Sequence, residues 1–599
     1  MKTLKFLSMA AIITVGAILA SCQKEENAPQ NQENPEAVET PADNIVVCTT
    51  TVNLAAGATK ALTPEGVKTF AESEKMAIFY KNTSGSFVKA VSEPLTVGDI
   101  TNEGKSASFT FQLANPDKTV NVHYVYPPDM ITEDGMMPNP ALLVAQDGTL
   151  DNVSSNLDLA YGNGPWDGEN LPGITLENQL AILAITLKNA DGSSDITGTI
   201  TGMTLSDGEQ SCTVTRSAAA GPIYVAIPPI SNKDIEITAT AGAKAYIKSL
   251  SGKTYEAGNG YNVSWRMETN LTAVSGHCTI DNGETLTGTL GGNYKVSIAD
   301  GATVVLKNAN ISYSSNGADY AGLTLLGDGT LVLADGTNNT AIGGLDGDGY
   351  SNWPGIFVPA GKTLTINGNT GVLNAARGGN DTTNGSPAGI GASWKNPCGN
   401  IIINGGVINA TGGAKSAGIG GAFTRTCGDI TINGGTITAI GHAWGSGIGL
   451  GAPVAKSVTS ISGCNITITG GTVTATGGVG GSEEQPGGAG IGTGYARNTN
   501  NNQTTNTITL GNICISGGTV IATGGVGAAA IGTSGTSGNS INNCGNITIT
   551  DGVTSVTATK GSGATNSIGK GSGNGTCGTV TIGSVTGAIS DSPYTYPVP

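Results

Sequence analysis

Hydrophobic and polar residues alternate in short runs along most of this chain, and Gly, Asn, Asp and Pro separate the runs. Val120–Tyr126 shows the alternation most clearly, whereas Leu180–Leu187 is apolar almost throughout. Strict alternation indicates a strand with one face buried, and a short continuous apolar run bounded by turns indicates a strand covered on both faces. The pattern therefore predicts an all-β protein.

Strand-like runs of this kind fill residues 45–270, with turn residues between them. Several short strands at this spacing are typical of β-sandwiches. We predict two sandwich domains, over residues 45–167 and 168–270.

Internal repeats dominate the chain from about residue 275 onward. The unit Cys398–Gly413, followed by Ala417–Gly421, recurs 29 residues later from Cys427, and further copies begin at Asn465, Asn512 and Asn546. Each copy holds three short strands and Gly-rich corners, so stacked copies would form a parallel β-helix over residues 275–599. We expect the final Ser592–Pro597 segment to cover its open end.

Within each repeat, Ile and Val occupy alternate strand positions, and Thr, Asn and Ser occupy the others. The first set is expected inside the solenoid and the second outside. Insertions such as Gly480–Gly487 and Ala496–Thr507 are expected in surface loops. Eight to ten turns at ~4.8 Å each would give a rod ~40–50 Å long.

The N-terminus has the features of an export signal. Lys2 and Lys5 precede an apolar run from Phe6 to Leu19, which is short for a membrane span. The run ends in Leu19-Ala20-Ser21-Cys22, a lipobox-like sequence. We predict a signal peptide over residues 1–21, a lipidated Cys22 and an unstructured tether over residues 22–44. An ordinary secretory signal is the alternative.

Five segments of the predicted sandwiches resemble, in their order and spacing, the fimbrillin family, the two-domain surface lipoproteins that form or decorate fimbriae. The segments are Glu74–Phe79, Asp158–Tyr161, Leu180–Leu187, Val225–Pro229 and Glu256–Val263. The resemblance covers residues 45 to 268 and implies two β-sandwiches, association with other fimbrial subunits and attachment to a membrane through the N-terminal lipid.

The same resemblance bears on location and maturation. Gln23–Glu26 is similar to the acidic tag that sends some lipoproteins of the Bacteroidota to the outer face of the outer membrane. Family members that polymerise are trimmed near a basic residue in the first strand, and Lys60 is the nearest counterpart. Lys60 replaces the usual Arg, so whether this chain is cleaved and polymerises stays open.

Composition excludes one class of partner. The formal net charge is -16 and no Lys/Arg cluster occurs, so we expect no nucleic-acid binding. High glycine content, with 93 residues in 599, together with few aromatic residues, suits short strands joined by tight turns.

No catalytic constellation stands out, and we predict a protein that is not an enzyme and needs no metal or cofactor. A solenoid hydrolase or lyase needs clustered carboxylates. Asp346 and Asp348 could meet Arg377 or hold Ca²⁺, although a Gly-Asp turn is the simpler explanation. The remaining candidates are dispersed: His123, His277 and His442, and after residue 396 only Asp429, Glu483, Glu484, Asp551 and Asp591.

Cysteines recur at one point of the repeat. Cys398, Cys427, Cys544 and Cys577 each precede the first strand of a turn, and Cys464 is one residue out of step. We expect a stack of buried side chains. A metal site and disulfides between adjacent turns are the alternatives.

Four aromatic residues fall in or beside the loops between strands and are candidates for ligand binding: Trp353, Trp394, Trp444 and Tyr495. Aromatic faces beside hydroxyls and amides suit sugar stacking, and filling gaps over the turns is the alternative. The function that we predict is a cell-surface adhesin that binds a glycan or protein ligand through its β-helix. The alternative is a polysaccharide-binding module for glycan capture.

Overall fold

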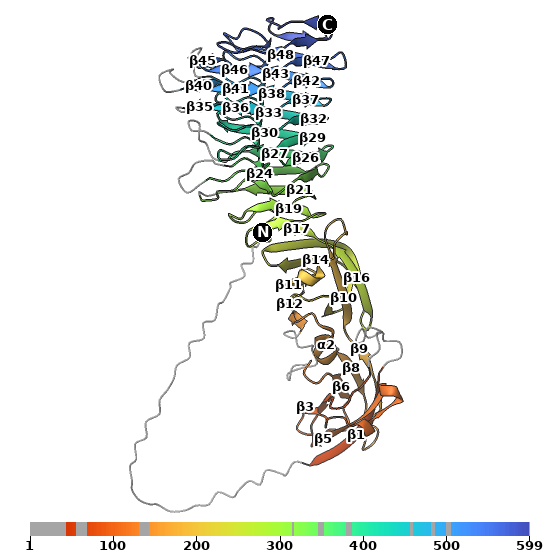
Figure 1. Cartoon of the computed structure of the whole chain (residues 1–599). Coiled ribbons are helices and arrows are strands. Elements are labelled where there is room, and N and C mark those ends of the chain that lie inside the picture. Colours follow the sequence, from red (N-terminus) through yellow and green to blue (C-terminus); the bar gives the residue numbers. More distant parts are fainter. Residues whose placement is uncertain are drawn as a thin grey trace, which may run out of the picture.

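The computed structural model describes residues 44–54, 69–130, 143–157, 159–313, 317–345, 353–378, 386–455, 459–480, 485–498 and 505–597. This part of the chain is almost entirely β-structure, as predicted, and has two kinds of architecture (Figure 1). Sandwich-like sheets form its N-terminal part, and a tall stack of turns forms its C-terminal part. The signal peptide, Cys22, most of the tether and Lys60 lie outside the described residues.

The first sheet bends around an aromatic core. Its strand order is β3-β2-β6-β8-β9-β1-β5-β4. Phe109 and Phe111 of β5 and Tyr124 and Tyr126 of β6 are buried in one core with Phe70, whose ring meets Phe109 edge-on at 5.4 Å. The strands are β1 (Ile45–Leu54), β2 (Ala77–Lys81), β3 (Phe87–Val91), β4 (Ile100–Thr101), β5 (Ser106–Ala114), β6 (Val122–Tyr126), β8 (Ala160–Gly164) and β9 (Ile174–Asn178).

A second pair of sheets follows. Leu183 and Ile185 of β10 share a core with Ile237 of β14 and Trp265 of β16. One sheet has the order β13-β10-β16, and β11, β12, β14 and β15 form the facing layer. These strands are β7 (Ala145–Gln146), β10 (Ala181–Lys188), β11 (Gly202–Ser206), β12 (Ser211–Thr215), β13 (Ile223–Ile227), β14 (Ile230–Ala241), β15 (Lys244–Tyr255) and β16 (Gly260–Arg266). The short helices α2 (Leu150–Asn152) and η3 (Val153–Leu157) lie between β7 and β8.

The facing layer continues directly into the solenoid. β15 pairs antiparallel with β17 (Glu268–Asn270), and β17 pairs parallel with β19 (Thr285–Thr289). β19 then pairs parallel with β21 (Ala302–Ser312), a long strand that contributes to two faces of the solenoid. Sandwich and solenoid therefore share one hydrogen-bonded sheet (Figure 1).

Three parallel ladders make up the solenoid, and we name them faces A, B and C. Face A consists of β23 (Gly329–Leu333), β26 (Thr363–Gly368), β29 (Asn400–Ile403), β32 (Ile430–Ile432), β37 (Ile466–Ile468), β42 (Ile513–Ile515), β47 (Ile547–Ile549) and β50 (Val580–Ile582). Face B consists of β24 (Asn338–Ile342), β27 (Val372–Ala376), β30 (Val407–Ala414), β33 (Thr436–His442), β38 (Thr472–Thr476), β43 (Thr519–Thr523) and β48 (Ser555–Thr559).

Face C is a ladder of ten short strands, which agrees with the predicted eight to ten turns. Its strands are β18 (Cys278–Ile280), β20 (Val296–Ile298), β22 (Leu323–Leu325), β25 (Ile356–Phe357), β28 (Ile390–Gly391), β31 (Ile419–Gly420), β34 (Ile448–Gly449), β39 (Ile491–Gly492), β44 (Ile531–Gly532) and β49 (Ile568–Gly569).

The solenoid interior is a column of aliphatic side chains, as the repeat pattern predicts. Ile401, Ile430 and Ile466 are in register on face A and fully buried. At the corner before face A, an Asn or Asp side chain of each turn accepts a hydrogen bond from the backbone N–H of the next. The series runs Asn400, Asp429, Asn465, Asn512, Asn546 and Thr579, each N···O distance being 2.9 Å.

The later turns are larger than the three-strand unit that the sequence predicts. Two further ladders join them: β35 (Val454–Ala455), β40 (Ala496–Asn498) and β45 (Thr536–Ser537), and β36 (Ser460–Gly463), β41 (Thr507–Leu510) and β46 (Ile541–Cys544). The prediction of a surface loop over Ala496–Thr507 was therefore wrong at both of its ends, because stacking against neighbouring insertions turns them into strands.

The last strands close the far end of the solenoid. β51 (Val585–Thr586) and β52 (Tyr594–Tyr596) pair antiparallel with β50 and β48. The C-terminal segment thus covers the final turn, as predicted. Among the described residues, no helix is long and apolar enough to cross a membrane.

Candidate functional site

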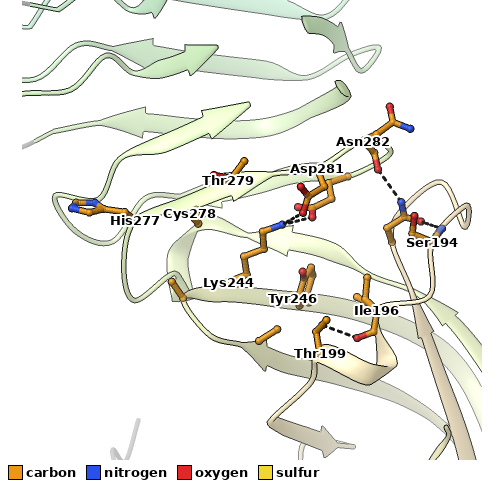
Figure 2. Close-up of a pocket in the computed structure, with 14 residues that line it drawn as sticks. Ser194, Ile196, Thr199, Lys244, Tyr246, His277, Cys278, Thr279, Asp281 and Asn282 are labelled. Carbon is orange, nitrogen blue, oxygen red and sulfur yellow. Dashed lines mark hydrogen bonds and ion pairs between the residues drawn. The ribbon is translucent and has the colours of Figure 1, made fainter. Parts of the chain in front are cut away.

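A cavity of about 470 Å³ lies where the second sandwich meets the first turn of the solenoid. Lys244 and Tyr246 of β15 line it from the sandwich side, and His277–Glu284 lines it from the solenoid side (Figure 2). The loop from Asn189 to Thr199 closes its third side.

An ion-pair network crosses this cavity. Lys244 Nζ lies 2.7 Å from Asp281 Oδ2 and 2.6 Å from Glu284 Oε1 (Figure 2). The other oxygen of Glu284 accepts a hydrogen bond of 2.8 Å from the hydroxyl of Thr269 in β17. Glu284 is 4% exposed, so its charge depends on these partners. The network joins β15, β17 and the start of β19.

Three titratable groups of this cavity, Lys244, Cys278 and Tyr246, are held in their protonated states near neutral pH because the pKa of each is raised. Burial alone would lower the pKa of Lys244, but Glu284 and Asp281 hold it well above its ordinary value. Burial raises the pKa of Cys278 to about 11, and burial together with Glu284 raises that of Tyr246 to about 12. A permanently charged ammonium and a neutral thiol are poor nucleophiles. The network therefore acts as a structural clamp.

His277 does not complete a catalytic group with Lys244. Its Nδ1 accepts a hydrogen bond of 2.9 Å from the backbone N–H of Lys295, and its ring meets those of Tyr294 and Tyr320 edge-on. Figure 2 shows the ring pointing away from the ion pairs.

A second candidate site is the flank of face C, where the four predicted aromatic residues lie. Trp353 precedes β25, Trp394 follows β28, Trp444 precedes β34 and Tyr495 follows β39. These strands belong to a run of five consecutive members of the face-C ladder, β25-β28-β31-β34-β39. All four residues therefore lie in segments that adjoin this run of face-C strands, and we call the surface that these segments form the flank of face C.

Trp353 and Trp394 differ in how much of the indole ring is exposed to solvent. Trp394 is 39% exposed. Trp353 is half-buried: its Nε1 donates to Asp319 Oδ1 at 2.6 Å and its ring meets Phe357 edge-on at 5.2 Å. Trp394 has the more accessible aromatic surface.

Tyr495 is only 1% exposed, and its hydroxyl lies 2.8 Å from that of Ser537. Its ring lies 6.5 Å from that of Trp444, so it supports Trp444 from inside. The expectation that Tyr495 contacts a ligand directly is corrected by this burial.

Lys415 and Arg425 complete the flank, and reasoning from sequence missed both. Lys415 Nζ lies 4.9 Å from the ring centre of Phe423 and 5.6 Å from that of Trp444. Arg425 Nε donates to the backbone carbonyl of Trp394 at 3.1 Å. A signal was present in the sequence: residues 377–599 contain eight Lys or Arg and six Asp or Glu, although the whole chain is strongly acidic.

The remaining chemical candidates stay apart or serve the fold. His123 lies in β6, where its Nδ1 is 2.6 Å from the Tyr161 hydroxyl, and Asp429 belongs to the corner series. In the part of the chain that the structure describes, no group of three or more His, Cys, Asp or Glu side chains could hold a metal ion. Asp346, Asp348, Glu483 and Glu484 lie outside the described residues.

The repeat cysteines form two groups. Cys544 and Cys577 are joined by a disulfide between neighbouring turns. Cys398, Cys427 and Cys464 are buried thiols. Two of the three outcomes that the sequence left open, stacked buried thiols and a disulfide between turns, therefore occur along one corner.

Comparison with known proteins agrees with the solenoid fold. A family model described as a β-helix repeat matches four segments, residues 401–423, 430–452, 466–495 and 513–535. No curated protein matches the chain.

Solved structures similar to the chain align with little more than a third of it. A fimbrial assembly protein of Parabacteroides distasonis is 11% identical over 38% of this chain and 96% of its own, with a TM-score of 0.22. A Bacteroides uniformis protein, whose name gives it a provisional role in cell adhesion, is 13% identical over 37% of this chain and 96% of its own, with a TM-score of 0.23.

Proposed function

We propose that this chain is a non-catalytic binding protein of the cell surface, an adhesin or a fimbria-associated component, whose ligand contacts the flank of face C. Cys22 would carry the lipid that anchors it to the outer membrane, facing outward, and other fimbrial subunits are candidate partners. The observation that carries the proposal is the row of aromatic and cationic side chains on that flank: Trp394, Lys415, Phe423, Arg425 and Trp444.

The chemistry of this row suits glycans. Aromatic faces stack on sugar rings, and a guanidinium or ammonium group can bind hydroxyls or carboxylates. Lys415 also holds Phe423 and Trp444 in place by its contacts with both rings, so less side-chain entropy is lost on binding.

A glycan and mucin binding assay on the full chain tests the proposal. The double variant Trp394→Ala, Trp444→Ala should lose binding by about tenfold or more, since each ring removed costs on the order of 1 kcal/mol. Trp166→Ala is the matched control, because Lys118 Nζ lies 5.7 Å from its ring centre in the first sheet, away from the solenoid.

Each result of the assay has a meaning. Retained binding in the control and loss in the double variant supports the flank as the site. Equal loss in both variants, or no binding to any glycan or mucin, contradicts it. Binding to soluble polysaccharides in preference to mucin would favour the alternative role, glycan capture.

A further inference from the structure

Two thiols in the solenoid, those of Cys398 and Cys427, lie in the same pattern of backbone hydrogen bonds as the disulfide between Cys544 and Cys577. In the bonded pair, Cys544 N donates to Thr576 O at 2.9 Å, and Gly578 N donates to the carbonyls of Cys544 and Gly545 at 2.9 and 3.1 Å. At the same corner in earlier turns of the stack, Cys398 N donates to Thr426 O at 3.1 Å. There Gly428 N donates to the carbonyls of Cys398 and Gly399 at 3.1 and 3.2 Å.

The side chains of the second pair also point the same way. Sγ of Cys398 lies 3.5 Å from Gly420 O, and Sγ of Cys427 lies 3.9 Å from Gly449 O and 3.2 Å from Gly428 O of its own turn. Gly420 and Gly449 are register partners in face C. The two sulfurs therefore occupy equivalent places in successive turns, both almost fully buried.

Cys464, the third thiol of this corner, is out of register. Counted from the first Ile of face A, Cys398 and Cys427 stand three residues before Ile401 and Ile430, but Cys464 stands two before Ile466. It takes the place that Gly399 and Gly428 hold in the turns below. The backbone pattern found at the disulfide is thus present between Cys398 and Cys427, whereas Cys464, although its side chain also interacts with that of Cys427, lies one residue out of that pattern.

From these observations we propose that Cys398 and Cys427 are the site of a second inter-turn disulfide, which leaves Cys464 as a free thiol. The proposal is independent of the ligand and of the proposed function. The bond ties the turn that follows Trp394 to the loop that carries Phe423 and Arg425, so it braces the aromatic flank.

The chemistry is thiol–disulfide exchange with a disulfide-containing oxidant of an extracytoplasmic compartment. The thiolate of one cysteine attacks the oxidant disulfide and forms a mixed disulfide, releasing one oxidant sulfur as a thiol. The second cysteine thiolate displaces the other oxidant sulfur. The two protein thiols lose two electrons and two protons, and the oxidant disulfide becomes two thiols.

The burial of these thiols determines when the bond between Cys398 and Cys427 can form. Burial raises the pKa of the Cys398 thiol well above its ordinary value, and in the folded solenoid little thiolate is available for attack. The bond therefore forms while the turns are assembling. A protein that folds fully reduced should then oxidise slowly.

Tryptic mapping of the full chain tests the site. The chain is purified without reductant and refolded in the presence of glutathione disulfide. It is then denatured in the presence of an alkylating agent, which blocks the free thiols, and digested with trypsin. Cleavage after Lys395, Lys415, Arg425, Lys456 and Arg497 places Cys398, Cys427 and Cys464 in separate peptides: 396–415, 426–456 and 457–497.

The expected result is a disulfide-linked pair of peptides 396–415 and 426–456, with alkylated Cys464 in peptide 457–497. The Cys544–Cys577 link in the same digest is the internal reference. The Cys464→Ser variant should keep the new link, and Cys398→Ser should leave Cys427 alkylated. A digest that contains the reference link while Cys398 and Cys427 are both alkylated overturns the proposal, as does a link between peptides 426–456 and 457–497.

Discussion

At the scale of single residues, the face-C glycines decide how closely the turns can stack. Gly449 has a φ of 129°, which side-chain-bearing residues rarely adopt. A Cβ placed on it would lie 2.1 Å from the carbonyl oxygen of Gly492 in the next turn. Backbone conformation and stacking distance therefore both require glycine here.

The Gly449→Ala variant should unfold more readily than Gly587→Ala. Gly587 has nearly the same φ, 131°, but nothing lies within 4 Å of its Cβ position. Both variants bear backbone strain of about 1–3 kcal/mol. Gly449→Ala should lose roughly another 1–3 kcal/mol because the next turn must move. Urea unfolding followed by solenoid tryptophan fluorescence measures both, and equal losses would show that stacking imposes no penalty.

Sequence reasoning succeeded for residues whose role repeats and failed for those whose role is unique. The inward Ile positions recur in every turn, so the pattern alone placed them. Lys415 and Tyr495 depend on how one loop meets the next: Lys415 contacts rings in two different loops, and Tyr495 is covered by its neighbours. No periodic pattern encodes such contacts.

At the scale of elements, the junction between sandwich and solenoid relies on the clamp formed by Lys244, Asp281 and Glu284. We expect Glu284→Gln to destabilise the junction by about 1–3 kcal/mol, because it removes a nearly buried countercharge while Asp281 still pairs with Lys244. Glu268→Gln is the control, since its partner Lys307 is 48% exposed and such pairs contribute less than about 1 kcal/mol.

Hydrogen exchange across β15, β17 and β19 measures the clamp locally. The pKa of Lys244 is higher in the folded state than in the unfolded chain. Its contribution is therefore full below the unfolded pKa of about 10.4 and is lost only as pH rises through the higher folded pKa. The difference between wild type and Glu284→Gln should stay constant from pH 7 to pH 9. A marked decline within that range would show that Lys244 is not held charged.

The terminal strand β52 should keep the solenoid monomeric. Removing residues 592–599 would expose the edge of β48, whose N–H and C=O groups could then pair with another chain. Light scattering should detect association of this truncated form. Removal of residues 598–599 alone retains β52 and is the control. If both truncated proteins stay monomeric, an element other than β52 protects the edge of β48 from pairing with another chain.

Strand identity inside the repeats was predictable, but the added ladders were not. β40 and β41 arise in an insertion whose sequence does not resemble the repeat unit. They become strands because β35 and β36 below, and β45 and β46 above, offer paired edges at the same height. The information lies in the stack of neighbours, which the local pattern does not contain.

At the scale of the whole molecule, one sheet runs from the second sandwich through the solenoid to its final turn. The first described strand, β1, lies at the opposite end of the described structure from the last turns (Figure 1). The alternating pattern indicated the two architectures and their order. Their union into one sheet depends on β17, a three-residue strand too short to be recognised in the sequence.

The corner series of Asn and Asp side chains makes each turn an interchangeable module. The side chain of Asn400 accepts a hydrogen bond from the backbone N–H of Asp429 in the next turn. The side chain of Asp429 in turn accepts one from the backbone N–H of Asn465 in the turn after that. A gene duplication of residues 398–426 would therefore insert a turn whose corner already matches the turns on both sides. Such a chain would be longer by ~4.8 Å with every hydrogen bond of the series retained. The length of the solenoid can thus change in whole turns, and each duplicated unit would bring a further copy of Lys415, Phe423 and Arg425 with it.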